Sequence, residues 1–194
     1  MVKEGWIVDE LVCGIDEAGR GPIAGPVAAA AVILPPEFPI EILADSKVLS
    51  PARRLRAAAC IREKAVAWAV GWATHEEIDR LNIHHATLLA MQRAVESLSI
   101  RPVRILVDGL HCPATGIPSE AIVKGDATVP QIMAASILAK TSRDAWMERY
   151  AEVEPSYGYE RHKGYPTAEH REIVRRLGPS RIQRMSFRVS SPSG

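Results

Sequence analysis

The sequence predicts an α/β protein in which a mixed β-sheet is flanked by helices. Three observations lead to this fold class. Short apolar runs rich in β-branched and small residues alternate with longer stretches that start with helix-capping residues. Proline and glycine pairs mark the boundaries between these segments. Several apolar runs also end in an acidic residue close to glycine, as strands do when they finish at a ligand-binding edge.

The predicted elements follow one another in the order strand, strand, helix, strand, helices, strand, strand, helices. The strands are short and apolar, and are expected over residues 11–15, 27–34, 66–73, 103–107 and 121–123. The helices are expected over 51–64, from 74, from 82 to about 98, from 128 to about 153, and over 167–177. Ser50, Thr74, Asn82 and Thr128 are the expected N-caps, and Gly178 ends the last helix.

Composition limits the class of protein. With 194 residues, 47% of them hydrophobic, the chain is expected to form one domain, with a core over about 1–153 and a basic helical part over about 154–190. The longest apolar run, 27–34, is too short for a membrane span, and the start has no apolar signal segment. The three cysteines form no C-x-x-C pair, which argues against zinc or disulfides and for the cytoplasm.

Charge is unevenly distributed along the chain. The net charge is +1, but residues 161–188 hold eight Lys/Arg and two Glu, a sum of +6 that leaves −5 for the remainder. This separation suits a protein that grips phosphate with one region and metal with another. A solvated basic helix face explains it equally well.

Acidic residues stand at three predicted strand ends: Asp16 with Glu17, then Asp108, then Asp126. Ligands of open α/β sheets collect at strand ends, so these carboxylates are expected to converge. Since neighbouring strand residues face opposite sides, Asp16 and Glu17 can share a site only where the strand breaks, as Gly19 and Gly21 suggest. Two Mg²⁺ or Mn²⁺ ions would neutralise the four acids, and could activate water and stabilise the leaving oxygen at a phosphate. A single Asp before Gly is more often a turn, so this prediction depends on the combination.

Other common site patterns do not fit. Gly19, Gly21 and Gly25 miss the G-x-G-x-x-G spacing by one residue, and the segment after them is a predicted strand where a dinucleotide site needs a helix. The EF-hand pattern is absent, and the histidines form no H-E-x-x-H pair.

The chain closely resembles bacterial ribonuclease HII, the type 2 ribonuclease H. Eight blocks occur in the order found in that family and span nearly the whole chain. They are G-I-D-E-A-G-R-G-P-I-A-G-P from Gly14, D-S-K from Asp45, L-N-I-H-H-A-T-L-L-A-M from Leu81, V-D-G from Val107, K-G-D-A from Lys124, A-A-S-I-L-A-K-T-S-R-D from Ala134, H-K-G-Y-P-T from His162 and R-M-S-F from Arg184.

The resemblance implies a ribonuclease H-like mixed sheet with a helical C-terminal extension. It implies endonucleolytic cleavage of RNA in RNA–DNA hybrids and nicking 5′ of single ribonucleotides in duplex DNA, giving 3′-hydroxyl and 5′-phosphate ends. The metal-binding and catalytic acids of the family fall on Asp16, Glu17, Asp108 and Asp126, with two manganese or magnesium ions as cofactors. The expected partners are RNA–DNA hybrid and ribonucleotide-containing DNA, bound by a monomer without contact to a membrane.

By the same resemblance, the backbone of Gly19, Arg20 and Gly21 contacts the ribonucleotide 2′-hydroxyl, the group that distinguishes RNA from DNA. Tyr165 matches a tyrosine that stacks on the deoxyribose 3′ of the ribonucleotide, and Lys47 a phosphate-contacting lysine. From the residues alone, an ordinary turn, a packed loop residue and a solvated lysine are the alternatives. The weaker phosphate candidates are Lys124, His162, Lys163 and Arg184, and Asp144 is expected near the acids or paired with an arginine.

One departure from the family pattern is Gln183, where histidine is more common. Two alternatives stay open. Ribonuclease HIII shares the catalytic core but carries an extra N-terminal domain, for which the first motif at Gly14 leaves no room. A non-catalytic nucleic-acid-binding module would have no need of all four acids.

Overall fold

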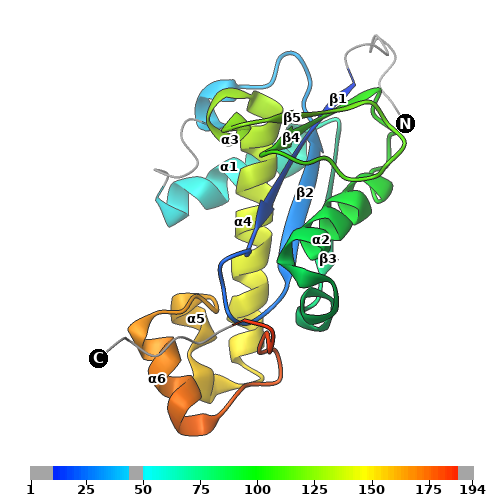
Figure 1. Ribbon diagram of the computed structural model, residues 1–194. Helices are drawn as coiled ribbons and strands as arrows, with labels where there is room; N and C mark the ends of the chain where they lie inside the picture. The colour runs from blue at the N-terminus through cyan, green and yellow to red at the C-terminus, as the bar shows by residue number, and fades with distance from the viewer. Residues whose placement is uncertain (1–10, 44–49, 188–194) are drawn as a thin grey trace.

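A five-stranded mixed sheet with helices on both faces forms the centre of the molecule (Figure 1). The computed structural model describes residues 11–43 and 50–187. The strand order is β3-β2-β1-β4-β5; β1, β2 and β3 pair antiparallel, while β4 and β5 run parallel to β1. The strands are β1 Val12–Ala18, β2 Val27–Ile33, β3 Ala67–Ala73, β4 Arg104–Asp108 and β5 Ser119–Ile122. The predicted α/β class and mixed sheet are confirmed.

The helices lie close to their predicted positions. They are α1 Pro51–Lys64, α2 His75–Glu96, α3 Gly125–Thr128, α4 Pro130–Ala151, α5 Tyr159–His162 and α6 Ala168–Leu177, with short 3₁₀ turns η2 Ile40–Leu43 and η3 Pro155–Tyr157. Ser50 caps α1 through Arg53 N–H, and Thr74 and Glu77 form the expected capping box of α2. Among the described residues, no helix has the length and apolar character needed to cross a membrane.

Asn82 divides α2 into two helical parts, as the sequence predicts. Its backbone is non-helical, with φ 67° and ψ 165°. Its side-chain Oδ1 accepts hydrogen bonds from the N–H groups of His84 and His85, at 2.9 and 3.2 Å. These bonds satisfy donors at the start of the second part, which is the work of an N-cap.

The predicted cap at Thr128 is wrong. Thr128 ends the one-turn helix α3, and the N-cap of α4 is Val129, which makes no side-chain capping bond. Pro130 follows, and a residue before proline is pushed out of the helical region; Val129 accordingly has φ −111° and ψ 113°. The Thr128 hydroxyl instead donates back to the Lys124 carbonyl at 3.3 Å.

Each face of the sheet is covered by a helix that approaches it at a glycine. All seven residues of β2 are buried, because α2 packs on one face and α4 with α1 on the other. A Cβ on Gly71 would lie 2.1 Å from the Ala90 carbonyl oxygen of α2. A Cβ on Gly14 would lie 2.1 Å from the backbone of Gln131 in α4. The expected core residues Met91 and Val95 are buried, and Leu88 packs beside them.

The C-terminal helices pack at one end of α4, in the lower part of Figure 1. Tyr157, Tyr159 and Ile173 form a separate apolar cluster there with Met147 of α4. Ala24, from the loop after β1, belongs to the same cluster. The C-terminal part therefore rests directly against the glycine-rich segment that follows the first two acids.

Replacing Gly14 by alanine is expected to destabilise the fold by about 3 kcal/mol or more, since backbone within two regular elements cannot move away from the new methyl group. Thermal denaturation of Gly14→Ala measures the loss. Gly21→Ala is the matched control, because the nearest atom to its added Cβ is a Tyr165 ring carbon at 3.7 Å. Equal melting temperatures for the two variants would contradict the close approach of α4 to β1.

Candidate active site

Asp16 and Glu17 lie within β1, not beyond its end. The pairing of β1 with β2 continues to Ala18, so the strand break expected at the two acids is wrong. The pairing of β1 with β4 stops at Ile15 and Val107, which leaves the edge of β1 open beside both acids. Since β1 still alternates here, Asp16 lies on the face covered by α4, and Glu17 on the face covered by α2.

Three of the predicted acids come together at this edge. One carboxylate oxygen from each of Asp16, Asp108 and Asp126 lies within 4.8 Å of the other two. Asp108 ends β4 on the same face as Asp16, and Asp126 enters from the first turn of α3. The Asp126 N–H donates to Asp108 Oδ1 at 3.2 Å, which fixes α3 against the end of β4.

Glu17 stands beside this trio rather than in it. Its Oε1 accepts a hydrogen bond from Arg20 Nη1 at 3.3 Å, and its side chain is 15% exposed. Glu17 and Asp108 both line a small cleft of about 130 Å³ on the α2 side, together with His84 and His111. The alternation of β1 explains this placement, since the strand does not break in time to turn both carboxylates the same way.

The environment of Asp16 and Glu17 disfavours their charged forms. Burial, and then the charge of Glu17, raises the pKa of Asp16 well above its usual value, while a hydrogen bond with Ser136 opposes part of the rise. Burial also raises the pKa of Glu17, against the opposing charge of Arg20. Carboxylate oxygens gathered at such a site fit a hard divalent cation, which would offset both burial and repulsion.

A groove of about 450 Å³ extends from Glu17 along the glycine-rich segment to Tyr165. We call it the Tyr165 groove; the predicted residues Gly19, Arg20, Gly21 and Tyr165 line it together, although the tyrosine is distant in sequence. Its other lining residues are Glu17, Ala18, Arg54, Ser136, Ile137 and Lys140.

The two glycines of G-R-G serve different purposes. Gly19 has φ 101°, and an added Cβ would lie 2.0 Å from Arg143 Nε, so the fold itself requires glycine there. Gly21 has no positive φ, and a Cβ there would meet only the Tyr165 ring, at an ordinary contact distance. Packing therefore does not explain Gly21, whereas close approach of a ligand to the groove wall would.

The other predicted site residues differ in burial and in the partners that they bind. Lys47 lies outside the described residues. Arg184 is fully buried and His162 is 7% exposed, so the prediction that they grip phosphate is wrong. Lys163 pairs with Glu148 at 2.7 Å, and Asp144 pairs with Lys140, not with an arginine.

Two cationic side chains of the groove were not predicted from the sequence. Arg54 comes from the first turn of α1, and Lys140 from the middle of α4 with its Nζ 5.6 Å from the Tyr165 ring centre. The run P-A-R-R-L-R at the start of α1 was the available signal for Arg54. In the C-terminal part, Arg161 and Arg175 pair with neighbouring glutamates, so its basic charge is partly neutralised internally.

Solved structures place this arrangement among the type 2 ribonucleases H. The ribonuclease HII in the PCNA complex from Archaeoglobus fulgidus superposes with a TM-score of 0.79 and 26% identity, covering 94% of this chain and 98% of that one. Bst-RNase HIII, solved with Mn²⁺, gives a TM-score of 0.69 at 19% identity, covering 92% of this chain and 67% of that one. The fold is therefore that of a ribonuclease H, with carboxylates at the open edge of its sheet.

The family is equally clear from sequence. The Ribonuclease HII family model matches residues 13–190. A Ribonuclease HII from Azoarcus sp. strain BH72 is 59% identical over 177 residues, covering 91% of this chain and 87% of the relative. The chain belongs to the ribonuclease HII family, whose members are hydrolytic endoribonucleases that act on RNA–DNA substrates with divalent metal ions. The alternative of a non-catalytic module is thereby excluded.

Asp16→Asn is expected to raise the melting temperature of the metal-free protein by roughly 2–4 °C, the shift produced by about 1 kcal/mol in a domain of this size. A carboxyl whose pKa is raised by folding destabilises the folded chain when it ionises. The advantage of the variant should therefore shrink as the pH falls from neutral. Thermal denaturation with chelator across this pH range measures the difference in melting temperature. A variant that melts below the wild type at neutral pH would contradict the unfavourable environment of the ionised Asp16 carboxylate.

Proposed function

We propose that this enzyme nicks duplex DNA on the 5′ side of a single embedded ribonucleotide, as well as cleaving the RNA strand of RNA–DNA hybrids. The observation that carries the proposal is the continuity of the acids with the Tyr165 groove. Glu17 belongs to the groove wall, and Ser136 of that wall hydrogen-bonds Asp16. A bound strand would thus present one sugar to the G-R-G wall and its 5′ phosphate to the acids.

The acids would hold two divalent ions, magnesium or manganese. Asp16, Asp108 and Asp126 already offer converging oxygens, and Glu17 borders the same edge. Bst-RNase HIII, which has the same fold, was solved with Mn²⁺. When bound, two such ions supply activation of the attacking water and neutralisation of the charge on the leaving oxygen. The carboxylates would hold these ions in place. Hydrolysis would break the P–O3′ bond to leave a 3′-hydroxyl and a 5′-phosphate.

The Tyr165 groove would select the junction between a ribonucleotide and DNA. Gly21 presents bare backbone to the groove, so a ribose 2′-hydroxyl can approach the main chain closely. Tyr165 is 38% exposed, and its ring faces the same space. A flat ring against the next sugar fits a deoxyribose better than a ribose, because no 2′-hydroxyl intervenes.

Cations around the groove would hold the phosphate backbone. Arg20, Arg54 and Lys140 line it from three different elements, and the Arg20 side chain is 50% exposed. Lysine and arginine contacts to phosphates position a duplex without reading its sequence. Lys47 stays a prediction as a further phosphate contact. We further propose that the enzyme is monomeric, works in the cytoplasm and serves the removal of ribonucleotides from DNA.

The direct test is a labelled duplex with one ribonucleotide, incubated with Mg²⁺ or Mn²⁺. We expect a single nick 5′ of the ribonucleotide, none with chelator, and none in all-DNA duplex. Asp126→Asn should reduce the rate on the order of 10³-fold, as loss of a group that stabilises transition-state charge typically does. Cleavage of long hybrids without nicking at a single ribonucleotide would refute the proposal and favour a ribonuclease HIII-like specificity.

Substitutions in the groove test how the junction is recognised. Tyr165→Ala is expected to lower kcat/KM at a ribonucleotide–DNA junction on the order of tenfold, the typical value of one stacked ring. Tyr165→Phe keeps the ring and should stay close to wild type. Gly21→Ala should lose at least about tenfold while melting normally, because a methyl group at the wall displaces the sugar. Wild-type junction preference in Tyr165→Ala would rule out the stacking role.

A further inference from the structure

A C-terminal segment lies directly against the glycine-rich loop that carries G-R-G. We call residues 182–187 the C-terminal strap and residues 19–26 the glycine turn. Ala24 and Gln183 form an antiparallel bridge between them, with Gly25 N–H donating to the Ile182 carbonyl and Arg184 N–H to the Ile23 carbonyl, both at 2.9 Å. The Gln183 amide adds a bond to the Ile23 carbonyl at 2.9 Å, so glutamine at this position has a structural role.

The side chain of Arg184 enters the inside of the glycine turn. It is fully buried, and its guanidinium donates to five carbonyl oxygens of the turn. Among the described residues, the acceptors of these hydrogen bonds are all backbone carbonyls, at 2.6–3.2 Å: those of Gly19, Arg20, Pro22, Gly25 and Pro26. A guanidinium has five N–H donors, so this one cation organises nearly the whole turn.

These bonds also fix which way the N–H groups of the turn point. In a planar trans peptide the carbonyl and the following N–H point in opposite directions. Because the carbonyls of Gly19 and Arg20 point inward to Arg184, the N–H groups of Arg20 and Gly21 point outward. Arg20 and Gly21 line the Tyr165 groove, so these two donors face the space proposed for the ribose. Adjacent N–H groups of this kind form a site for an oxygen acceptor.

Arg143 of α4 joins the same turn to the segment before Tyr165. It is 1% exposed and donates to the carbonyls of Pro26 and Ala24, and to that of Lys163 at 3.0 Å. Ile23 N–H donates to the Gly164 carbonyl at 2.9 Å. The glycine turn and the chain leading into Tyr165 are therefore held as one unit.

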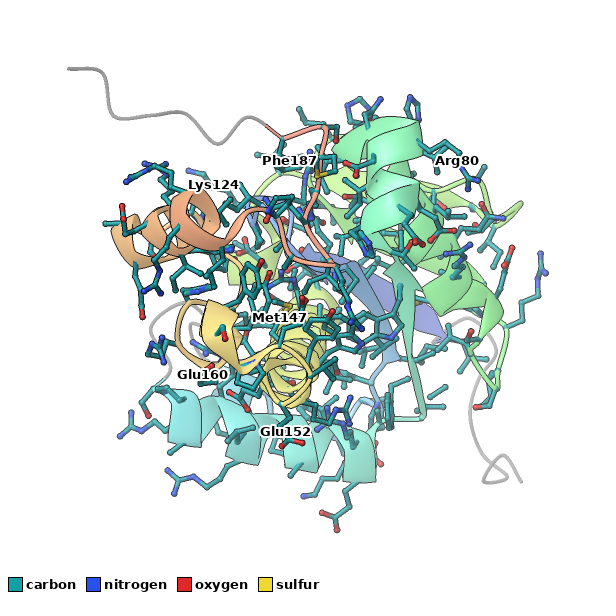
Figure 2. All side chains as sticks on the ribbon, turned by 90° about the horizontal axis from the view of Figure 1, so that it is seen from below. Arg80, Lys124, Met147, Glu152, Glu160 and Phe187 are labelled. Carbon is teal, nitrogen blue, oxygen red and sulfur yellow. The ribbon has the colours of Figure 1, made fainter. Side chains whose placement is uncertain are left out.

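The other end of the C-terminal strap is tied to α2. Asp79 accepts hydrogen bonds from the N–H groups of Met185 and Ser186, both at 2.9 Å, and from the Ser186 hydroxyl at 2.6 Å. Figure 2 shows the segment that carries Phe187 passing from α6 to the start of α2, which carries Arg80. The strap thus has an anchor on α2 and places Arg184 from that anchor.

We propose that Arg184 is a positioning residue for ribose recognition, and that Asp79 supports it by anchoring the C-terminal strap. The inference rests on the proposed function, since it assigns the outward N–H groups of Arg20 and Gly21 to the 2′-hydroxyl. Arg184 touches neither the acids nor the groove. Its effect is on the ability to distinguish ribose from deoxyribose, not on metal binding. Within the part of the chain that the structure describes, no carboxylate forms an ion pair with this buried cation. Such burial costs free energy, and the five oriented carbonyls offset that cost.

The test separates recognition from chemistry by measuring binding in an Asp126→Asn background. Affinities for a duplex with one ribonucleotide and for the all-DNA duplex give a ribose preference. Arg184→Lys, which keeps the charge but has fewer donors, should lower this preference at least about tenfold. Asp79→Ala leaves Arg184 in place and loosens only the strap, so it should lower the preference in the same direction. Met185→Ala, with a 70% exposed side chain on the same strap, is the matched control and should bind like the background protein.

Two further measurements make the outcomes distinct. With all acids intact, Arg184→Lys and Asp79→Ala should keep the wild-type rise in melting temperature on adding Mn²⁺, which a general loss of structure would abolish. If the background protein itself shows no ribose preference, the proposed function fails. If it shows one, and both Arg184→Lys and Asp79→Ala retain it, the positioning role alone is overturned.

Discussion

The close contact between α4 and β1 at Gly14 is the constraint on which the rest of the molecule depends. No side chain fits between Gly14 and the backbone of Gln131, so the helix lies directly on the strand. This contact places Ser136 against Asp16 and sets α3, with Asp126, at the end of β4. Further along the same helix, Lys140 and Arg143 reach the Tyr165 groove and the glycine turn. One helix thus positions the acids and the recognition wall relative to each other.

The site buries negatively charged carboxylates and, close by, positively charged guanidinium groups, and both burials are unfavourable. Three aspartates gather at one edge, and burial, followed by the charge of Glu17, raises the pKa of Asp16. A divalent cation would relieve both the burial of this charge and the repulsion between the acids. On the other side of the same chain segment, Arg143 and Arg184 are buried, and burial followed by the charge of Arg143 lowers the pKa of Arg184 to about 9. Backbone carbonyls of the glycine turn compensate the two cations. Both features sacrifice stability for a defined arrangement of charges and donors, as functional sites commonly do.

Much of the site was visible in the sequence because it depends on local signals. Acids next to strand ends predicted Asp16, Asp108 and Asp126, which the structure brings together. The resemblance to ribonuclease HII predicted the residues of the groove wall. Glu17 lies beside this trio, and its predicted part in holding metal stays a prediction. Arg184 was predicted to grip phosphate, although it is buried beneath the turn. The sequence alone does not distinguish an arginine that binds phosphate from one that binds backbone carbonyls. The difference lies in whether the side chain is buried, and burial depends on how the whole chain packs.

The sequence by itself determined the α/β class, most element boundaries and the family, and it predicted the acids, since periodicity, caps and motif spacing are encoded within a few neighbouring residues. Only the tertiary structure decided which carboxylates converge, that Arg54 and Lys140 enter the groove, and that the C-terminal strap holds the glycine turn. These outcomes depend on contacts between residues far apart in the chain, such as Arg184 with Gly19 and Asp79 with Ser186. Such contacts follow from how helices pack on a twisted sheet, which no local pattern specifies.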